Sequence, residues 1–103
     1  MASLLLLLSY VNREPAQLTL RIEKVSDGRL VILHLSGRLQ SEHLQELKAH
    51  MEGISQKVVL NLEQVKLVDR EAVCFLAVCE DNGTQLNQCS PYIREWIDRE
   101  RAS

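Results

Sequence analysis

The residues best suited to chemistry in this chain are three cysteines, three histidines and one short acidic turn. Cys74, Cys79 and Cys89 form an odd set without C-x-x-C spacing, which argues against a disulfide framework and against a structural zinc site. His43 and His50 are seven residues apart on one predicted helix, too far for a shared metal ion. We therefore predict reduced, mostly buried thiols, and no metal or cofactor.

The acidic turn is Val68-Asp69-Arg70-Glu71, and its residues suit the N-terminus of a helix. Asp69 is a favoured N-cap, and the charge of Glu71 is favourable near the positive end of the helix dipole. A sharper interpretation is that Glu71 imitates a phosphorylated residue, but one carboxylate lacks the charge and geometry of phosphate. No Ser-His-Asp set, paired-carboxylate pocket or glycine-rich phosphate loop can be recognised, so we predict no enzymatic activity.

The helix that follows is predicted from about Arg70 to Asn82, with Gly83 as its stop. Its sequence is unusually apolar, and helical periodicity divides it into two faces. The predicted core face holds Val73, Leu76 and Ala77. The predicted second face holds Glu71, Cys74, Phe75 and Val78. The second face is either covered by another element or forms a contact surface, and the sequence favours neither alternative.

The first half of the chain supplies two predicted strands and a helix. Apolar and polar residues alternate from 18 to 23, as in a strand with one buried face, and Asp27-Gly28 predicts a tight hairpin turn. Residues 30–35 predict an interior strand that contains His34 as a core histidine and ends at Gly37. Ser41 is the predicted N-cap of a helix that stops near Gly53 and has Leu44, Leu47 and Met51 on one face.

The second half supplies two more strands and the last helix. Residues 58–62 predict a short β-branched strand, and residues 84–89 predict a polar edge strand. Ser90-Pro91 predicts a helix start, and Ile93, Trp96 and Ile97 form the buried stripe of that helix. The predicted fold is α/β, a single-layer mixed sheet of about four strands backed by helices, in the order β-β-α-β-α-β-α.

Composition and the N-terminus narrow the class of protein. A length of 103 residues suits one small domain, and a net charge of −2 without a basic aromatic cluster argues against nucleic-acid binding. Leu4–Leu8 is an unbroken leucine run, too short for a membrane span and lacking the basic residues of a signal peptide. We predict an N-terminal extension over 1–16, a domain over 17–103 and a cytoplasmic location.

Several short motifs occur in a characteristic order: Gly37-Arg38-Leu39, Val58–Leu62, Val65-x-x-Val68-Asp69, Asn82-Gly83 and Ser90-Pro91. Together they resemble the STAS domain, which is found in sulfate-transporter C-terminal regions and in bacterial anti-sigma-factor antagonists. The resemblance covers roughly residues 17–97. It implies a divergent, C-terminally shortened member of this family, with a non-catalytic role in protein binding and transcription regulation in bacteria.

The resemblance also implies a site at the acidic turn. In the antagonists, a serine in an Asp-Ser-Ser/Thr-Gly turn is phosphorylated by an anti-sigma-factor kinase, and the phosphate changes the choice of partner. Here Arg70 and Glu71 stand at the hydroxyl positions, so this turn has no phosphorylation site. The predicted partner-binding residues are Gln40, Asp69, Arg70, Glu71, Cys74, Phe75 and Val78. The partner would be an anti-sigma-factor-like kinase or a transporter ATPase.

An alternative function is self-association. Family members commonly continue with a further strand and helix, and in this alternative the leucine run of this chain supplies the missing strand, in the same chain or in a second copy. The second arrangement would be a strand-swapped homodimer with a structural role.

Overall fold

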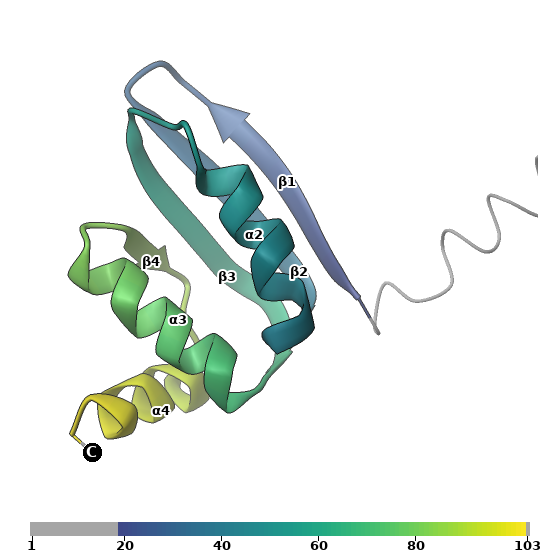
Figure 1. The fold of residues 1–103 in the computed structure, drawn as a ribbon, viewed down its shortest axis with the longest axis vertical. Coiled ribbons are helices and arrows are strands. Elements are labelled where there is room, and N and C mark those ends of the chain that lie inside the picture. Colours follow the sequence, from purple (N-terminus) through teal and green to yellow (C-terminus); the bar gives the residue numbers. More distant parts are fainter. Residues whose placement is uncertain (1–18, 103) are drawn as a thin grey trace, which may run out of the picture.

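The computed structural model describes residues 19–102, so the predicted extension over 1–16 and the leucine run lie outside the described residues. The described elements follow one another in the predicted order, apart from an added 3₁₀ turn (Figure 1). They are β1 (Leu20–Ser26), β2 (Leu30–Leu39), the 3₁₀ turn η1 (Ser41–His43), α2 (Leu44–Met51), β3 (Lys57–Val68), α3 (Arg70–Asp81), β4 (Gln85–Asn87) and α4 (Pro91–Ala102).

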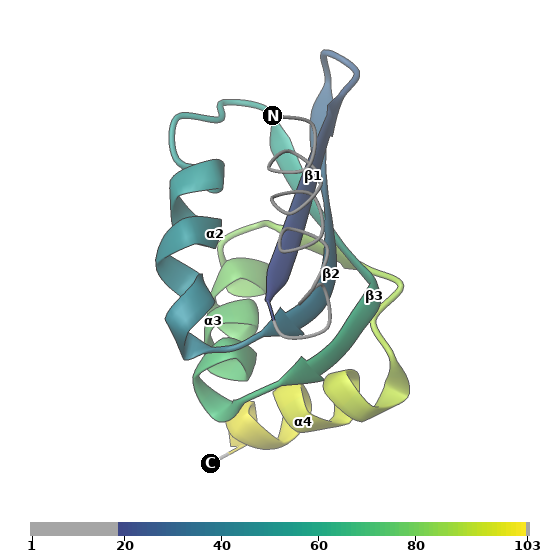
Figure 2. The same cartoon turned by 90° about the vertical axis from the view of Figure 1, so that its right-hand side faces the viewer.

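The four strands form one mixed sheet in the order β1-β2-β3-β4. β1 and β2 are antiparallel and joined by the predicted hairpin, while β3 is parallel to both β2 and β4. α2 and α3 lie beside each other on one face of the sheet, and α4 crosses below α3 at the end where β3 runs into α3 (Figure 2). The predicted fold class is confirmed, and β4 is an edge strand as expected.

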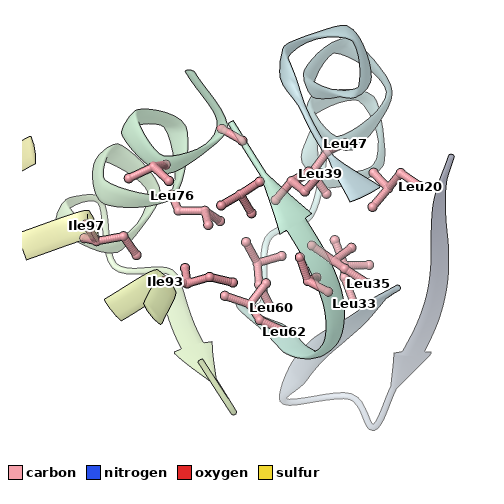
Figure 3. Close-up of a cluster of buried hydrophobic side chains, with 14 of the residues drawn as sticks. Leu20, Leu33, Leu35, Leu39, Leu47, Leu60, Leu62, Leu76, Ile93 and Ile97 are labelled. Atoms are coloured by element: carbon pink, nitrogen blue, oxygen red, sulfur yellow. The ribbon is translucent and has the colours of Figure 1, made fainter. Parts of the chain in front are cut away.

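The hydrophobic core lies between the sheet and the helices (Figure 3). Leu33 and Leu60, from the two central strands, are fully buried and face Leu47 of α2 and Leu76 of α3. Ile97 of α4 is fully buried at the other end of the same cluster. One continuous aliphatic core therefore joins the sheet to all three helices.

Local signals account for the turns that the sequence predicts. The side chain of Asp27 accepts hydrogen bonds from the backbone N–H groups of Arg29 and Leu30, both at 3.0 Å. Gly28 has a φ of +91°, a conformation that glycine adopts without a steric cost. Before α4, the Ser90 hydroxyl accepts a hydrogen bond from Ile93 N at 3.3 Å, as predicted for an N-cap followed by proline.

Several strand lengths differ from the prediction; β4, for example, spans only Gln85–Asn87 rather than 84–89. β2 does not end at Gly37 but continues to Leu39, because Gly37, with a φ of +94°, sits in an irregular stretch where the register with β3 shifts. Glycine at such a bulge bends a strand without ending it. β3 is also longer than predicted and reaches Val68, since its polar residues face away from the core while Val65 and Val68 remain buried.

Other predictions for single residues are also corrected. Ser41 does not cap an α-helix; it begins η1, whose N-cap is Gln40. His34 is exposed, because its neighbours Leu33 and Leu35 occupy the core side of β2 and alternation turns the histidine to the opposite face. Cys74 is exposed as well, so the thiols are not mostly buried.

Candidate functional site

Asp69 joins the two loops at one end of the sheet. Leu39 and Val68, the last residues of β2 and β3, are partners in the parallel ladder, so the loops that follow them lie side by side. Asp69 Oδ1 accepts a hydrogen bond from Ala72 N at 2.9 Å, and Oδ2 accepts one from Ser41 N at 2.8 Å. Partial desolvation raises the pKa of Asp69, but these two donations outweigh it and leave the pKa below its usual value.

Gln40 lies in the loop that Asp69 holds. Its backbone N–H donates to Nδ1 of His43 at 3.3 Å, and His43 N donates to the Gln40 carbonyl oxygen at 2.8 Å. His43 is the buried polar residue of this region. Gln40 therefore shapes the loop beside Asp69.

Arg70, the first residue of α3, is held by α4. Its Nε donates to Glu100 Oε1 at 3.2 Å, while most of the guanidinium side chain stays exposed, at 74%. Glu100 also accepts hydrogen bonds from Cys74 Sγ at 3.8 Å and from Trp96 Nε1 at 3.3 Å. Desolvation raises the pKa of Glu100, but Arg70 and Trp96 donate to its charged form and leave the pKa lowered. α4 thus fixes the side chain that follows the Asp69 cap.

An open groove with a volume of about 730 Å³ runs between α2 and α3. Five of the seven predicted partner-binding residues line it, and all five lie on α3: Arg70, Glu71, Cys74, Phe75 and Val78. Asp69 and Gln40 lie outside the lining, at the loops before α3 and α2. The predicted division of α3 into a core face and a second face is confirmed, since Val73, Leu76 and Ala77 are buried.

The second face of α3 is accessible in the described part of the chain. Val78 is 55% exposed and Cys74 is exposed, while Phe75 is half-buried beneath the ammonium group of Lys48, which lies 5.6 Å from the ring centroid. The described elements therefore leave these side chains open to solvent.

The α2 side of the groove was not predicted. Leu44 and Lys48 line it beside α3, and Met51 lines its continuation with Glu52. Leu44 and Met51 are only partly buried, although their helical spacing suggested core positions. Lys48 lies one turn after Leu44, so the two side chains share one face of α2. This spacing is the feature of the sequence that could have indicated a face of α2 with both apolar and charged residues.

The other two thiols have no sign of reactivity. Burial raises the pKa of Cys79 to about 11, and desolvation also raises the pKa of Cys89. In the described residues, no group of three or more metal-ligating side chains comes together. Over the same residues, no helix is long and apolar enough to cross a membrane.

α4 is attached to the far end of α3 by a group of ion pairs. Glu80 accepts two hydrogen bonds from Arg94, at 3.0 and 2.9 Å, and forms an ion pair with Arg101 at 3.0 Å. Arg101 also donates to Asp81 at 2.9 Å and to the Ala77 carbonyl oxygen at 3.1 Å. The first and last turns of α3 are thus both tied to α4.

Comparison with known proteins supports the fold. No protein-family model matches the chain, and no curated protein sequence matches it. A solved structure does match: that of the anti-sigma factor antagonist SpoIIAA in its unphosphorylated form, with a TM-score of 0.54 and 17% sequence identity over 81% of each chain. The chain therefore has a fold like that of this antagonist, which confirms the STAS-like architecture predicted from the motifs.

Proposed function

We propose that this chain is a non-catalytic, regulatory protein-interaction domain. It binds its partner through the Asp69–Glu71 turn and the groove between α2 and α3. The observation that carries this proposal is the apolar stripe of exposed Cys74 and Val78 and half-buried Phe75, which lines a groove next to the turn. Apolar side chains that gather in an accessible groove are typical of a contact surface, because covering them removes apolar area from water.

The turn is proposed to work without a phosphorylation switch. Arg70 and Glu71 occupy the first two positions of α3, where the STAS resemblance expects hydroxyl residues, and neither side chain has the hydroxyl that a serine kinase phosphorylates. Arg70 is instead engaged by Glu100 of α4. The docking surface is therefore proposed to be permanently competent, with any regulation acting elsewhere.

The two hydrogen-bonded carboxylates beside the turn, those of Asp69 and Glu100, are better suited to holding the structure together than to catalysis. Both oxygens of Asp69 accept backbone hydrogen bonds, so its carboxylate is committed to holding two loops together. Glu100 is occupied by Arg70, Trp96 and Cys74. A general acid or base needs a carboxyl group that is free to reach a substrate proton.

The partner is proposed to be a protein of a regulatory pathway in the bacterial cytoplasm. The structurally similar SpoIIAA is an anti-sigma factor antagonist, so an anti-sigma-factor-like kinase is the first candidate. A transporter ATPase is the other candidate partner, and the identity of a captured protein distinguishes the two.

The test compares two matched substitutions on opposite faces of the domain. Val78 is 55% exposed in the groove, and Val25 is 51% exposed on β1, outside it. Wild-type protein, Val78→Lys and Val25→Lys are immobilised and exposed to extract from the native host, and the bound proteins are identified by mass spectrometry. We expect one protein to be retained by the wild type and by Val25→Lys and lost with Val78→Lys. Equal retention by all three would overturn the proposal.

A further inference from the structure

We infer that the partner inserts an amphipathic helix of about three turns into the α2–α3 groove, with a carboxylate directed at Lys48. This inference rests on the proposed function and specifies the partner segment. The occupant is argued from three properties of the groove: its length, the state of its backbone groups and its unpaired charges.

The length of the groove matches a short helix. Its α3 wall runs from Glu71 through Phe75 and Val78 to Asn82, which is about 16 Å along the helix axis. The α2 wall runs beside it through Leu44, Lys48 and Met51, in a single helical stripe. Two adjacent helices that present parallel stripes form the hollow into which a third helix packs.

The backbone of the groove disfavours an extended occupant. Both walls are α-helices, whose interior N–H and C=O groups are already paired within each helix. A strand in the groove would find no edge with which to share its own backbone hydrogen bonds, and a buried unpaired backbone group is costly. A helix satisfies its backbone internally and presents only side chains to Phe75 and Val78.

The charges of the groove specify the polar part of the partner. Lys48 lies in the middle, above the ring of Phe75, and forms no ion pair with any carboxylate of the described residues. Glu71, one turn before Phe75, likewise has no ion-pair partner there, whereas Arg70 is paired with Glu100. A complementary helix carries an acidic residue opposite Lys48 and a basic residue about one turn away.

The shape of the groove disfavours a second copy of this chain as the occupant. In a two-fold dimer centred on the groove, each surface meets its own copy. The hollow between α2 and α3 of one copy would then face the same hollow of the other, and neither would fill its partner. A single helix from another protein fills the hollow.

The experiment uses a displayed library of random 15-residue peptides, selected on the wild-type protein and counter-selected on Val78→Lys. We expect enriched sequences with apolar residues at i, i+3 or i+4, and i+7, and with an acidic residue beside them. Amide shifts on binding should concentrate at Leu44, Lys48, Phe75 and Val78. Affinity should fall by a factor of about 10 or more in Val78→Lys and remain unchanged in Val25→Lys.

The second part of the experiment reverses the charge at position 48. In Lys48→Glu, the selected acidic peptide should bind about two- to fivefold more weakly, and a version with lysine at its acidic position should recover that loss. Enriched peptides with strand-like alternation, equal affinity of both charge versions, or no enrichment over Val78→Lys would each overturn the inference. If a host protein still binds in a Val78-dependent way, the proposed function stands and only the helical occupant is rejected.

Discussion

Asp69 shows how one side chain can fix the backbone of two loops that are far apart in the sequence. Its two carboxylate oxygens hold the N-terminus of α3 and the start of η1, 28 residues earlier in the chain. The cap on α3 could be predicted, because aspartate before an apolar helix is a local signal. The bond to Ser41 could not, because it depends on the pairing of Leu39 with Val68 in the folded sheet.

Replacing Asp69 by alanine should lower the free energy of unfolding by about 1–2 kcal/mol at pH 7, because two backbone N–H groups lose their acceptor. The pKa of Asp69 is lowered in the folded protein, so its stabilising effect is present above the unfolded pKa of about 4. That effect is lost as the pH falls through the folded pKa. Urea denaturation at pH 7 measures the loss of stability, and the same experiment at decreasing pH measures its dependence on pH.

The matched control is Asp69→Asn, which keeps one oxygen acceptor and the shape of the side chain but cannot ionise. Its stability should lie between those of the wild type and the alanine variant at pH 7. In acid, the wild type should approach the asparagine variant. A difference between these two proteins that stays constant across the pH range would contradict the assigned role.

At the scale of the element, strand lengths were the weakest part of the prediction. Gly37 indicated a strand end, but β2 passes through it because neighbouring strands on both sides supply hydrogen bonds to the irregular stretch. Helix boundaries were predicted more closely, since Asp69 and Ser90 are local caps that act before any tertiary contact forms. Helical periodicity was enough to predict which residues form the second face of α3. It could not predict the exposure of that face, because the exposure depends on where α2 and α4 pack.

Both apolar contacts and ion pairs hold α4 against α3. Their contributions to the free energy of unfolding can be compared. Ile97 is fully buried, so Ile97→Ala should cost about 2–5 kcal/mol of unfolding free energy. Glu80→Gln removes ion pairs whose side chains are about one-third exposed, so it should cost only about 1 kcal/mol. Chemical denaturation of both variants measures the difference, and apolar packing should dominate.

Salt separates the two contributions further. Raising the ionic strength should shrink the effect of Glu80→Gln and leave that of Ile97→Ala nearly unchanged, because screening acts on exposed charges. Asp98→Asn is the control, since its contact with Arg94 is 3.9 Å long and its side chain is 63% exposed. A cost for Glu80→Gln equal to that of Ile97→Ala would show that charge, and not packing, holds α4.

At the scale of the whole molecule, the element order and sheet class followed from local patterns, but the groove did not. Its α2 wall requires knowing that α2 and α3 lie side by side on one face of the sheet, which is a tertiary fact (Figure 1). Helical spacing predicted core positions for Leu44 and Met51. Periodicity shows which residues share a face of a helix, but it does not show how deeply that face is buried. The predicted residues on α3 therefore line the groove, whereas the residues of its α2 wall were not predicted.

The continuity of the core leads to a prediction about unfolding. Leu33, Leu60, Leu76 and Ile97 belong to one buried cluster that joins the sheet, α3 and α4. An element whose buried side chains belong to a shared core should not leave it without disrupting the rest, so the domain should unfold in a single cooperative step. Trp96 is the single tryptophan of the chain and reports on α4 directly.

Fluorescence of Trp96 and far-UV circular dichroism should therefore give the same urea midpoint. In Ile97→Ala, both midpoints should move down together, because weakening α4 weakens the common core. The opposing view is that α4, the last of the described helices, is held mainly by its ion pairs with Glu80 and detaches first. In that case the fluorescence transition of Ile97→Ala would precede the loss of circular dichroism, and α4 would be an independent element able to release Arg70 from Glu100 while the sheet stays folded.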